Sequence, residues 1–115
     1  MKKAATKRNS AKLTVYTGDE VVRLYMLLRR VSLKELGHFF DGARALQEVK
    51  NYVKQEPAGE DLVQYICEED EIEMDFTRDE RAACVEAIEQ GIKGGLVTLE
   101  DGLHLKSLRD KLKVK

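Results

Sequence analysis

The side chains best suited to chemistry in this sequence are polar and basic residues at helical spacing between residues 43 and 54. They are Arg44, Gln47, Lys50, Asn51 and Lys54. Arginine, glutamine and asparagine can each make paired hydrogen bonds to base edges, whereas lysine is suited to phosphate. If one helix carries all five on its outer side, that side could enter the major groove of duplex DNA.

The first twelve residues carry five basic side chains and no acid. Such a segment neutralises phosphates without reading sequence, so we expect Lys3, Lys7 and Arg8 to add phosphate contacts. No apolar stretch follows it, which argues against a secretory signal and predicts a cytoplasmic protein. We expect residues 1–11 to form a flexible basic tail.

The segment from Glu56 to Asp75 has the opposite charge, with nine acids and no base. Its candidate binding residues are Glu68, Glu69, Asp70, Glu71 and Glu73. Because apolar residues are interleaved with these acids, the segment could present a surface to a basic protein or mimic a nucleic-acid backbone. The solvated side of an amphipathic strand or helix would give the same pattern.

Two functional hypotheses follow from these charged segments. The first is a small DNA-binding regulatory protein, of bacterial or phage type and acting as a dimer, because one short helix gives limited affinity for DNA. The alternative is a non-enzymatic protein-interaction module, such as an inhibitor, antitoxin or adaptor, that acts through the acidic segment 56–75. A homodimer is also compatible with the breadth of the apolar side expected for helix 18–30.

Catalysis has little support in the residue pattern. His38 and His104 belong to no nucleophile, metal or phosphate-binding motif, and Cys67 and Cys84 lack the CxxC spacing typical of zinc sites. We therefore expect no catalytic residue, metal or cofactor, and we expect both cysteines in the core. No apolar run approaches the roughly 20 residues of a membrane-spanning helix, so no membrane partner is expected.

The elements that must position these residues are marked by capping boxes and apolar periodicity. The three Ser/Thr-x-x-Glu pairs are Thr17 with Glu20, Ser32 with Glu35, and Thr77 with Glu80. The expected helices span residues 18–30, 33–40, 43–54 and 78–93. Asp41-Gly42 should end the second of these, so that the second and third form a helix-turn-helix with 43–54 as the DNA-reading helix.

The alternation of apolar and polar residues predicts two strands. Residues 12–16 should bury Leu13 and Val15, and residues 71–76 should bury Ile72, Met74 and Phe76. Residues 60–69 suit a helix or a strand, and the helix is favoured because acids stand at its start.

Near the C-terminus, within residues 93–107, a three-residue turn of Glu100, Asp101 and Gly102 predicts a β-hairpin that places Val97, Leu99, Leu103 and Leu105 on one face. The helix expected at residues 78–93, which precedes this hairpin, is rich in acids, so the hairpin is not expected to contact DNA as a wing. The prediction is a single α+β domain over residues 12–115, with four main helices and a small antiparallel sheet that includes this C-terminal β-hairpin.

The stretch KLTVYTGDEVVRLYMLLRR, in which a short strand leads directly into a helix, resembles the ribbon-helix-helix repressors and antitoxins. The resemblance covers about the first third of the chain and rests on apolar patterning alone. It implies that strands paired between two subunits enter the major groove of DNA. Lys12, Thr14 and Tyr16 would then face the DNA.

Overall fold

Four α-helices and two two-stranded antiparallel sheets make up residues 14–113, the part of the chain that the computed structural model describes. The first half contains β1 (Thr14–Thr17), α1 (Gly18–Arg30), α2 (Leu36–Lys50), β2 (Lys54–Pro57) and β3 (Val63–Ile66). The second half contains β4 (Glu71–Met74), α3 (Arg78–Lys93), the 3-10 turn η1 (Leu99–Asp101) and α4 (Gly102–Leu112). The α+β class is confirmed, and the predictions for the basic tail, Lys12 and Leu13 lie outside the described residues.

The helix starts at Gly18 and Arg78 are confirmed, because both capping boxes form. The Thr17 hydroxyl accepts from the Glu20 N–H at 3.1 Å, while the Thr17 N–H donates to the Glu20 carboxylate at 2.9 Å. Thr77 and Glu80 make the same reciprocal pair, both bonds being 3.0 Å long. Free N–H groups at each helix start are thereby satisfied by local chemistry.

The predicted break at Asp41-Gly42 is wrong, because residues 36–50 form one continuous helix. Gly42 is buried inside it, and a Cβ there would lie 2.9 Å from Leu33 and 4.0 Å from Ala83 of α3. Glycine therefore serves close packing here and not a turn. The Ser32 capping box is also wrong, since α2 begins at Leu36 after Glu35, which makes no side-chain cap.

Strand β1 pairs with β4 of the same chain, and this pairing reverses the predicted face of β1. Tyr16 lies opposite Ile72 and is fully buried, whereas Val15 lies opposite Glu73 and is 43% exposed. Residues directly opposite each other share a face, so the buried Ile72 fixes Tyr16 inward. The prediction of β4 as a half-buried strand is confirmed, with Ile72 and Met74 buried.

The ribbon-helix-helix interpretation of this region is wrong. Its strand should pair with a strand of a second subunit, but β1 is hydrogen-bonded to β4 within the chain. Tyr16 faces the core, where its ring meets Phe76 edge-on with centroids 6.1 Å apart. Burial also raises the pKa of Tyr16 to about 12.

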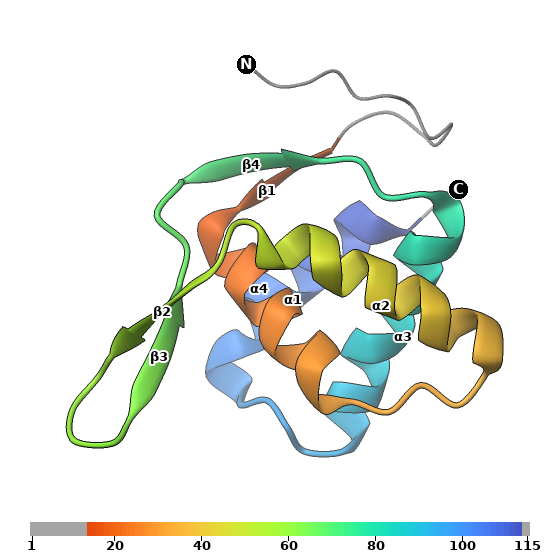
Figure 1. Ribbon diagram of the computed structural model, residues 1–115. Helices are drawn as coiled ribbons and strands as arrows, with labels where there is room; N and C mark the ends of the chain where they lie inside the picture. The colour runs from red at the N-terminus through yellow and green to blue at the C-terminus, as the bar shows by residue number, and fades with distance from the viewer. Residues whose placement is uncertain (1–13, 114–115) are drawn as a thin grey trace.

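Residues 54–66 form a β-hairpin in which β2 pairs with β3, so the helix favoured for residues 60–69 is wrong. The turn between the strands uses positive φ angles at Gly59 (128°) and Asp61 (61°), which a helix could not accommodate. The hairpin projects to one side of the helices, and the bend that follows leads directly into β4 (Figure 1).

The C-terminal β-hairpin is also wrong, because residues 102–112 form helix α4. Thr98 and Asp101 form a capping box that starts η1, and Gly102 has helical dihedrals (φ −56°, ψ −47°). Leu105, Leu108 and Leu112 then fall on the buried side of α4 at helical spacing. The Asp-Gly pair therefore begins a helix and does not turn a hairpin.

The core lies between the helices and the inner face of β1 and β4. α1 and α3 approach so closely that a Cβ at Gly91 would lie 2.4 Å from a methyl carbon of Leu27. Cys84 is buried in this core as expected, whereas Cys67 is only half-buried. No helix within residues 14–113 is long and apolar enough to cross a membrane.

Candidate functional site

The five residues predicted for a DNA-reading helix do not share one helix face. Arg44, Gln47 and Lys50 are exposed on α2, Asn51 follows the helix as its C-cap, and Lys54 begins β2. The structure therefore leaves three of the five on the outer side of one helix.

Two of these cations already have acidic partners within the chain. Arg44 forms an ion pair with Asp41, and its Nε lies 3.5 Å from a carboxylate oxygen of Glu80. The Lys54 ammonium lies 2.9 Å from Glu68, whose hydrogen bond and charge raise the pKa of Lys54. Binding of a phosphate by either side chain would compete with these internal partners.

The N-terminal half of α2 is apolar on its outer side. In a helix that reads the major groove, this half meets the base edges. In α2 its exposed side chains are Leu36, Phe39 and Phe40, which offer no hydrogen-bond donor or acceptor to a base. Its chemistry therefore fits an apolar contact better than a base edge.

The acidic segment gathers its charge on one exposed feature, which we call the acidic ribbon. It comprises the exposed acids of the β2–β3 turn, the bend after β3 and the outer face of β4. These are Glu60, Asp61, Glu68, Glu69, Asp70, Glu71 and Glu73. All five acids predicted as protein-binding candidates belong to it, and the other two acids of the segment, Glu56 and Asp75, are half-buried.

Strand alternation and one glycine hold the acidic ribbon outward. Ile72 and Met74 point into the core, so the alternating Glu71 and Glu73 point away from it. At the bend, the Gly18 N–H donates to the carbonyl of Asp70 at 3.2 Å. A Cβ at Gly18 would lie 2.6 Å from the Glu69 carbonyl oxygen, so the bend sits against the start of α1 only because residue 18 is glycine.

A cluster of Arg29, Tyr25 and Tyr65 attaches the hairpin to α1. Arg29 donates to the Tyr65 hydroxyl at 2.8 Å, and its guanidinium carbon lies 5.0 Å from the Tyr65 ring centroid and 5.4 Å from that of Tyr25. The two rings meet edge-on at 5.3 Å. The i, i+4 spacing of Tyr25 and Arg29 is visible in the sequence, but Tyr65 has no sequence signal that would join it to them.

The negative charge of the acidic ribbon acts on the neighbouring Tyr52. Burial, followed by the charges of Glu48 and Glu69, raises the pKa of Tyr52 beside it. A dense exposed group of one sign attracts an oppositely charged partner and accelerates its association, and salt weakens this attraction.

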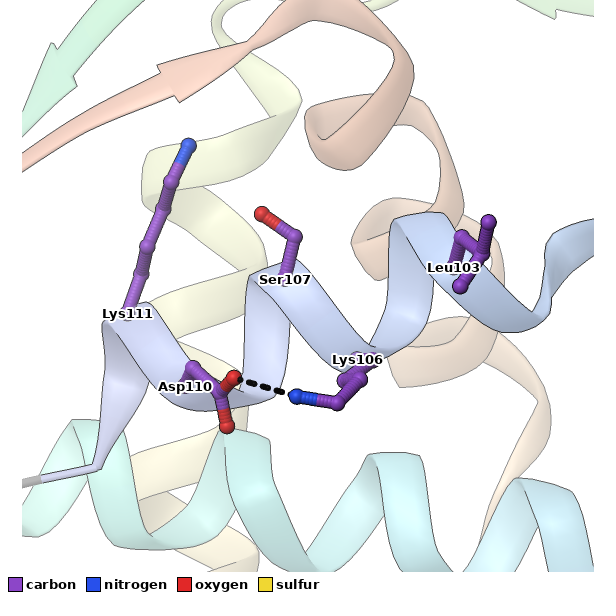
Figure 2. Close-up of a pocket in the computed structure, with 5 residues that line it drawn as sticks. All are labelled: Leu103, Lys106, Ser107, Asp110 and Lys111. Atoms are coloured by element: carbon purple, nitrogen blue, oxygen red, sulfur yellow. Dashed lines mark hydrogen bonds and ion pairs between the residues drawn. The ribbon is translucent and has the colours of Figure 1, made fainter.

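A shallow hollow of about 400 Å³ lies beside α4 (Figure 2). Its lining residues are Leu103, Lys106, Ser107, Asp110 and Lys111. Lys106 pairs with Asp110 at 3.1 Å, while Ser107 and Lys111 donate to the buried carboxylate of Glu20 at 2.6 and 2.8 Å. The bonds from Ser107 and Lys111 hold α4 against α1, which gives these two residues a structural role.

The Glu20 carboxylate at the centre of this cluster is kept charged. Burial alone would raise the pKa of Glu20, but hydrogen bonds from Lys111, Ser107 and Thr17 outweigh burial and lower it. Such a carboxylate is a poor general base for activating Ser107. Within residues 14–113, no three His, Cys, Asp or Glu side chains are grouped as metal ligands would be.

Comparisons of the chain with protein-family models, with curated proteins and with solved structures found no match. The chemistry of the surface therefore carries the functional argument. Its two prominent features are the acidic ribbon and the apolar outer side of α2.

Proposed function

We propose that this chain is a non-enzymatic protein-interaction module, such as an inhibitor, antitoxin or adaptor, that binds a basic partner through the acidic ribbon. The observation that carries this proposal is the exposure of all seven ribbon acids along one stretch of chain, from the β2–β3 turn through the bend to the outer face of β4, whose opposite side is buried. A solvated strand would expose acids too. The bend adds three consecutive exposed acids, Glu68, Glu69 and Asp70, beyond what strand alternation explains.

Apolar side chains at the tip of the hairpin support a protein partner. Leu62 and Val63 are exposed beside Glu60 and Asp61. Charge steers a partner and sets its orientation, while burial of apolar side chains supplies affinity. The two free thiols, Cys67 and Cys84, suit a protein of the reducing cytoplasm.

Charge reversal tests the proposal, and the structure indicates which acids to reverse. Glu68 pairs with Lys54, so its reversal would disturb the hairpin itself. Glu69 and Glu71 are exposed and avoid this difficulty. Their double reversal, Glu69→Lys with Glu71→Lys, should weaken partner binding about tenfold or more.

The matched control is Glu89→Lys with Glu100→Lys, which makes the same change in net charge on exposed helical positions. A partner captured by the wild-type chain at low salt would be identified, purified and titrated against each variant by calorimetry. Loss of binding in the ribbon variant alone supports the proposal. Equal loss in both variants, or retention in the ribbon variant, contradicts it.

Duplex DNA stays a second candidate because of the order of the elements. α1, the connection at residues 31–35 and α2 are followed by a projecting β2–β3 hairpin, as a reader helix is followed by a wing in winged-helix proteins. α2 would then present Arg44, Gln47 and Lys50 to DNA, with Lys3, Lys7 and Arg8 on phosphates.

A gel-shift titration with random-sequence duplex at low salt tests the DNA candidate. Arg44→Ala or Gln47→Ala should change sequence preference, whereas Lys3→Ala should lower affinity uniformly. Absence of binding at low salt would rule it out.

A further inference from the structure

The β2–β3 hairpin has two outer edges, and its register shows which backbone groups point outward at each. The Ala58 N–H donates to the Leu62 carbonyl at 2.9 Å, so these two residues are a hydrogen-bonded pair of the ladder. In an antiparallel ladder, such pairs alternate with pairs whose N–H and C=O groups point away from the partner strand. Four residues therefore turn these groups outward. They are Gln55 and Pro57 on β2, and Val63 and Tyr65 on β3.

The two edges differ in their capacity to pair with another strand. At the β2 edge, Pro57 has no N–H to donate, and proline is a common means of closing a sheet edge. At the β3 edge, the outward N–H and C=O groups of Val63 and Tyr65 bond to no other group among the described residues. Val63 is also 55% exposed. The β3 edge is therefore open to a third strand, whereas the β2 edge is blocked at Pro57.

Acids stand at both ends of the open edge. Glu60 and Asp61 precede β3, and the three acids of residues 68–70 follow it. Two copies of β3 paired antiparallel about Gln64 would set Glu60 opposite Glu68, and in a parallel pair each acid would lie beside its own counterpart. Like charges placed in this way destabilise strand pairing. The charge of the edge thus disfavours a second copy of the chain and favours a basic segment.

We propose that an extended basic segment of a partner protein adds to β3 as the third strand of this sheet. The inference rests on the proposed function and names the form of its partner. Backbone hydrogen bonds with Val63 and Tyr65 supply the pairing, and bases at both ends of the segment meet the acidic ribbon. The Tyr65 hydroxyl already accepts a hydrogen bond from Arg29 of α1, so β3 is held in place before the partner binds.

A synthetic peptide with blocked ends, KKTVTVTVKK, is the probe, because it carries bases at both ends of a segment that favours β structure. Calorimetric titration at low salt should show binding that weakens as salt rises. The matched control is the same peptide with methylated backbone nitrogens in its TVTVTV segment. It keeps every side chain and charge but cannot donate to β3, so it should bind about tenfold more weakly or less.

These two peptides separate strand pairing from charge attraction. Equal binding of both overturns the inference but leaves the charge contact of the proposed function standing. Absence of binding by the unmethylated peptide at low salt also overturns the inference, while the proposed function is still decided by charge reversal of the acidic ribbon against the captured partner.

Val63→Pro and Gln55→Pro form a matched pair of variants. Each removes one outward N–H without removing a hydrogen bond between β2 and β3, but they act on opposite edges of the hairpin. Val63→Pro should weaken peptide binding about tenfold, whereas Gln55→Pro should keep the wild-type affinity. Slow hydrogen exchange of the Gln64 amide, which faces β2, verifies that each variant retains the hairpin. Equal affinities of the two variants overturn the inference.

Hydrogen exchange in the unsubstituted chain tests the edge directly. The Val63 amide should exchange rapidly in the chain alone and slowly when the peptide is bound, while the Gln55 amide should exchange rapidly in both states. Slow exchange at Val63 in the chain alone would mean that a second copy, or residues 1–12 of the same chain, already covers the edge. That result would overturn the assignment of the edge to a basic partner.

Discussion

Lys111 donates a 2.8 Å hydrogen bond to Glu20 across 91 positions of sequence, joining the end of α4 to the first turn of α1. Glu20 also receives hydrogen bonds from the Ser107 hydroxyl and the Thr17 N–H. One buried carboxylate thus completes a helix cap and holds a second helix in place.

Replacing Glu20 tests this double role. Glu20→Gln should lower the free energy of unfolding at neutral pH by about 1–3 kcal/mol, because charge-assisted hydrogen bonds are lost. The folded pKa of Glu20 lies below its ordinary value of 4.5, so its stabilisation is present above that value and disappears as pH falls through the folded pKa. Urea unfolding across this acid range should therefore show a flatter pH dependence in the variant. Glu89→Gln, at an exposed position, should keep the wild-type slope.

Replacing Arg29 tests whether its cluster with Tyr25 and Tyr65 anchors the β2–β3 hairpin to α1. Arg29→Ala removes a hydrogen bond and two cation–π contacts, which should cost about 1 kcal/mol. Hydrogen exchange should then quicken in β2 and β3 while α3 stays protected. Arg30→Ala, at the neighbouring exposed position, is the control. Equal exchange in both variants would show that Arg29 does not anchor the hairpin.

Gly18 and Gly102 make opposite predictions for the same substitution. Gly18→Ala should destabilise the fold by about 1–3 kcal/mol, because its Cβ would meet a backbone carbonyl oxygen of the acidic bend at 2.6 Å. Gly102→Ala, in a helical position with nothing within 4 Å, should stabilise it by about 0.5–1 kcal/mol. Thermal unfolding measures both, and a stabilising Gly18→Ala would contradict the described contact.

The two cysteines should differ sharply in reactivity. Burial raises the pKa of the Cys84 thiol well above its usual range, and the side chain is fully buried, whereas Cys67 is half-buried. Iodoacetamide should therefore modify one thiol of the native protein and both after unfolding. Peptide mapping should place the native label on Cys67. Rapid native labelling of Cys84 would mean that the core opens readily.

The helices at 18–30 and 78–93 were predictable because their signals are local. A capping threonine, a glutamate three residues later and a periodic apolar stripe all lie within one helix. The break at Gly42 could not be judged this way, since Leu33 and Ala83, which fill the space beside Gly42, become its neighbours only in the folded chain. The same glycine signal therefore marks a turn in one context and a packing contact in another.

The C-terminal region shows two local signals in competition. Asp101-Gly102 suits a hairpin turn, while Thr98 with Asp101 suits a helix cap, and alternating leucines at 103 and 105 favoured the hairpin. Tertiary packing decides between them, because Leu105, Leu108 and Leu112 enter the core together only as a helix.

The acidic ribbon was predictable in part. The amino-acid composition located the acidic residues of the ribbon. The alternation of polar and apolar residues predicted that the acids of β4 point away from the core. The bend that groups the acids could not be predicted, because it depends on Gly18 meeting a backbone some fifty residues away, as the hydrogen bond to Asp70 shows.

The position of β1 affects how the protein should be prepared for experiments. Thr14 pairs with Met74, so the described chain begins next to the strand that carries Glu71 and Glu73, and a tag fused ahead of residue 1 is tethered to β1 by the intervening residues. A basic or histidine-rich purification tag at that end would act as a tethered competitor at high local concentration. Binding measurements on the acidic ribbon therefore need a cleaved tag, or one placed after α4.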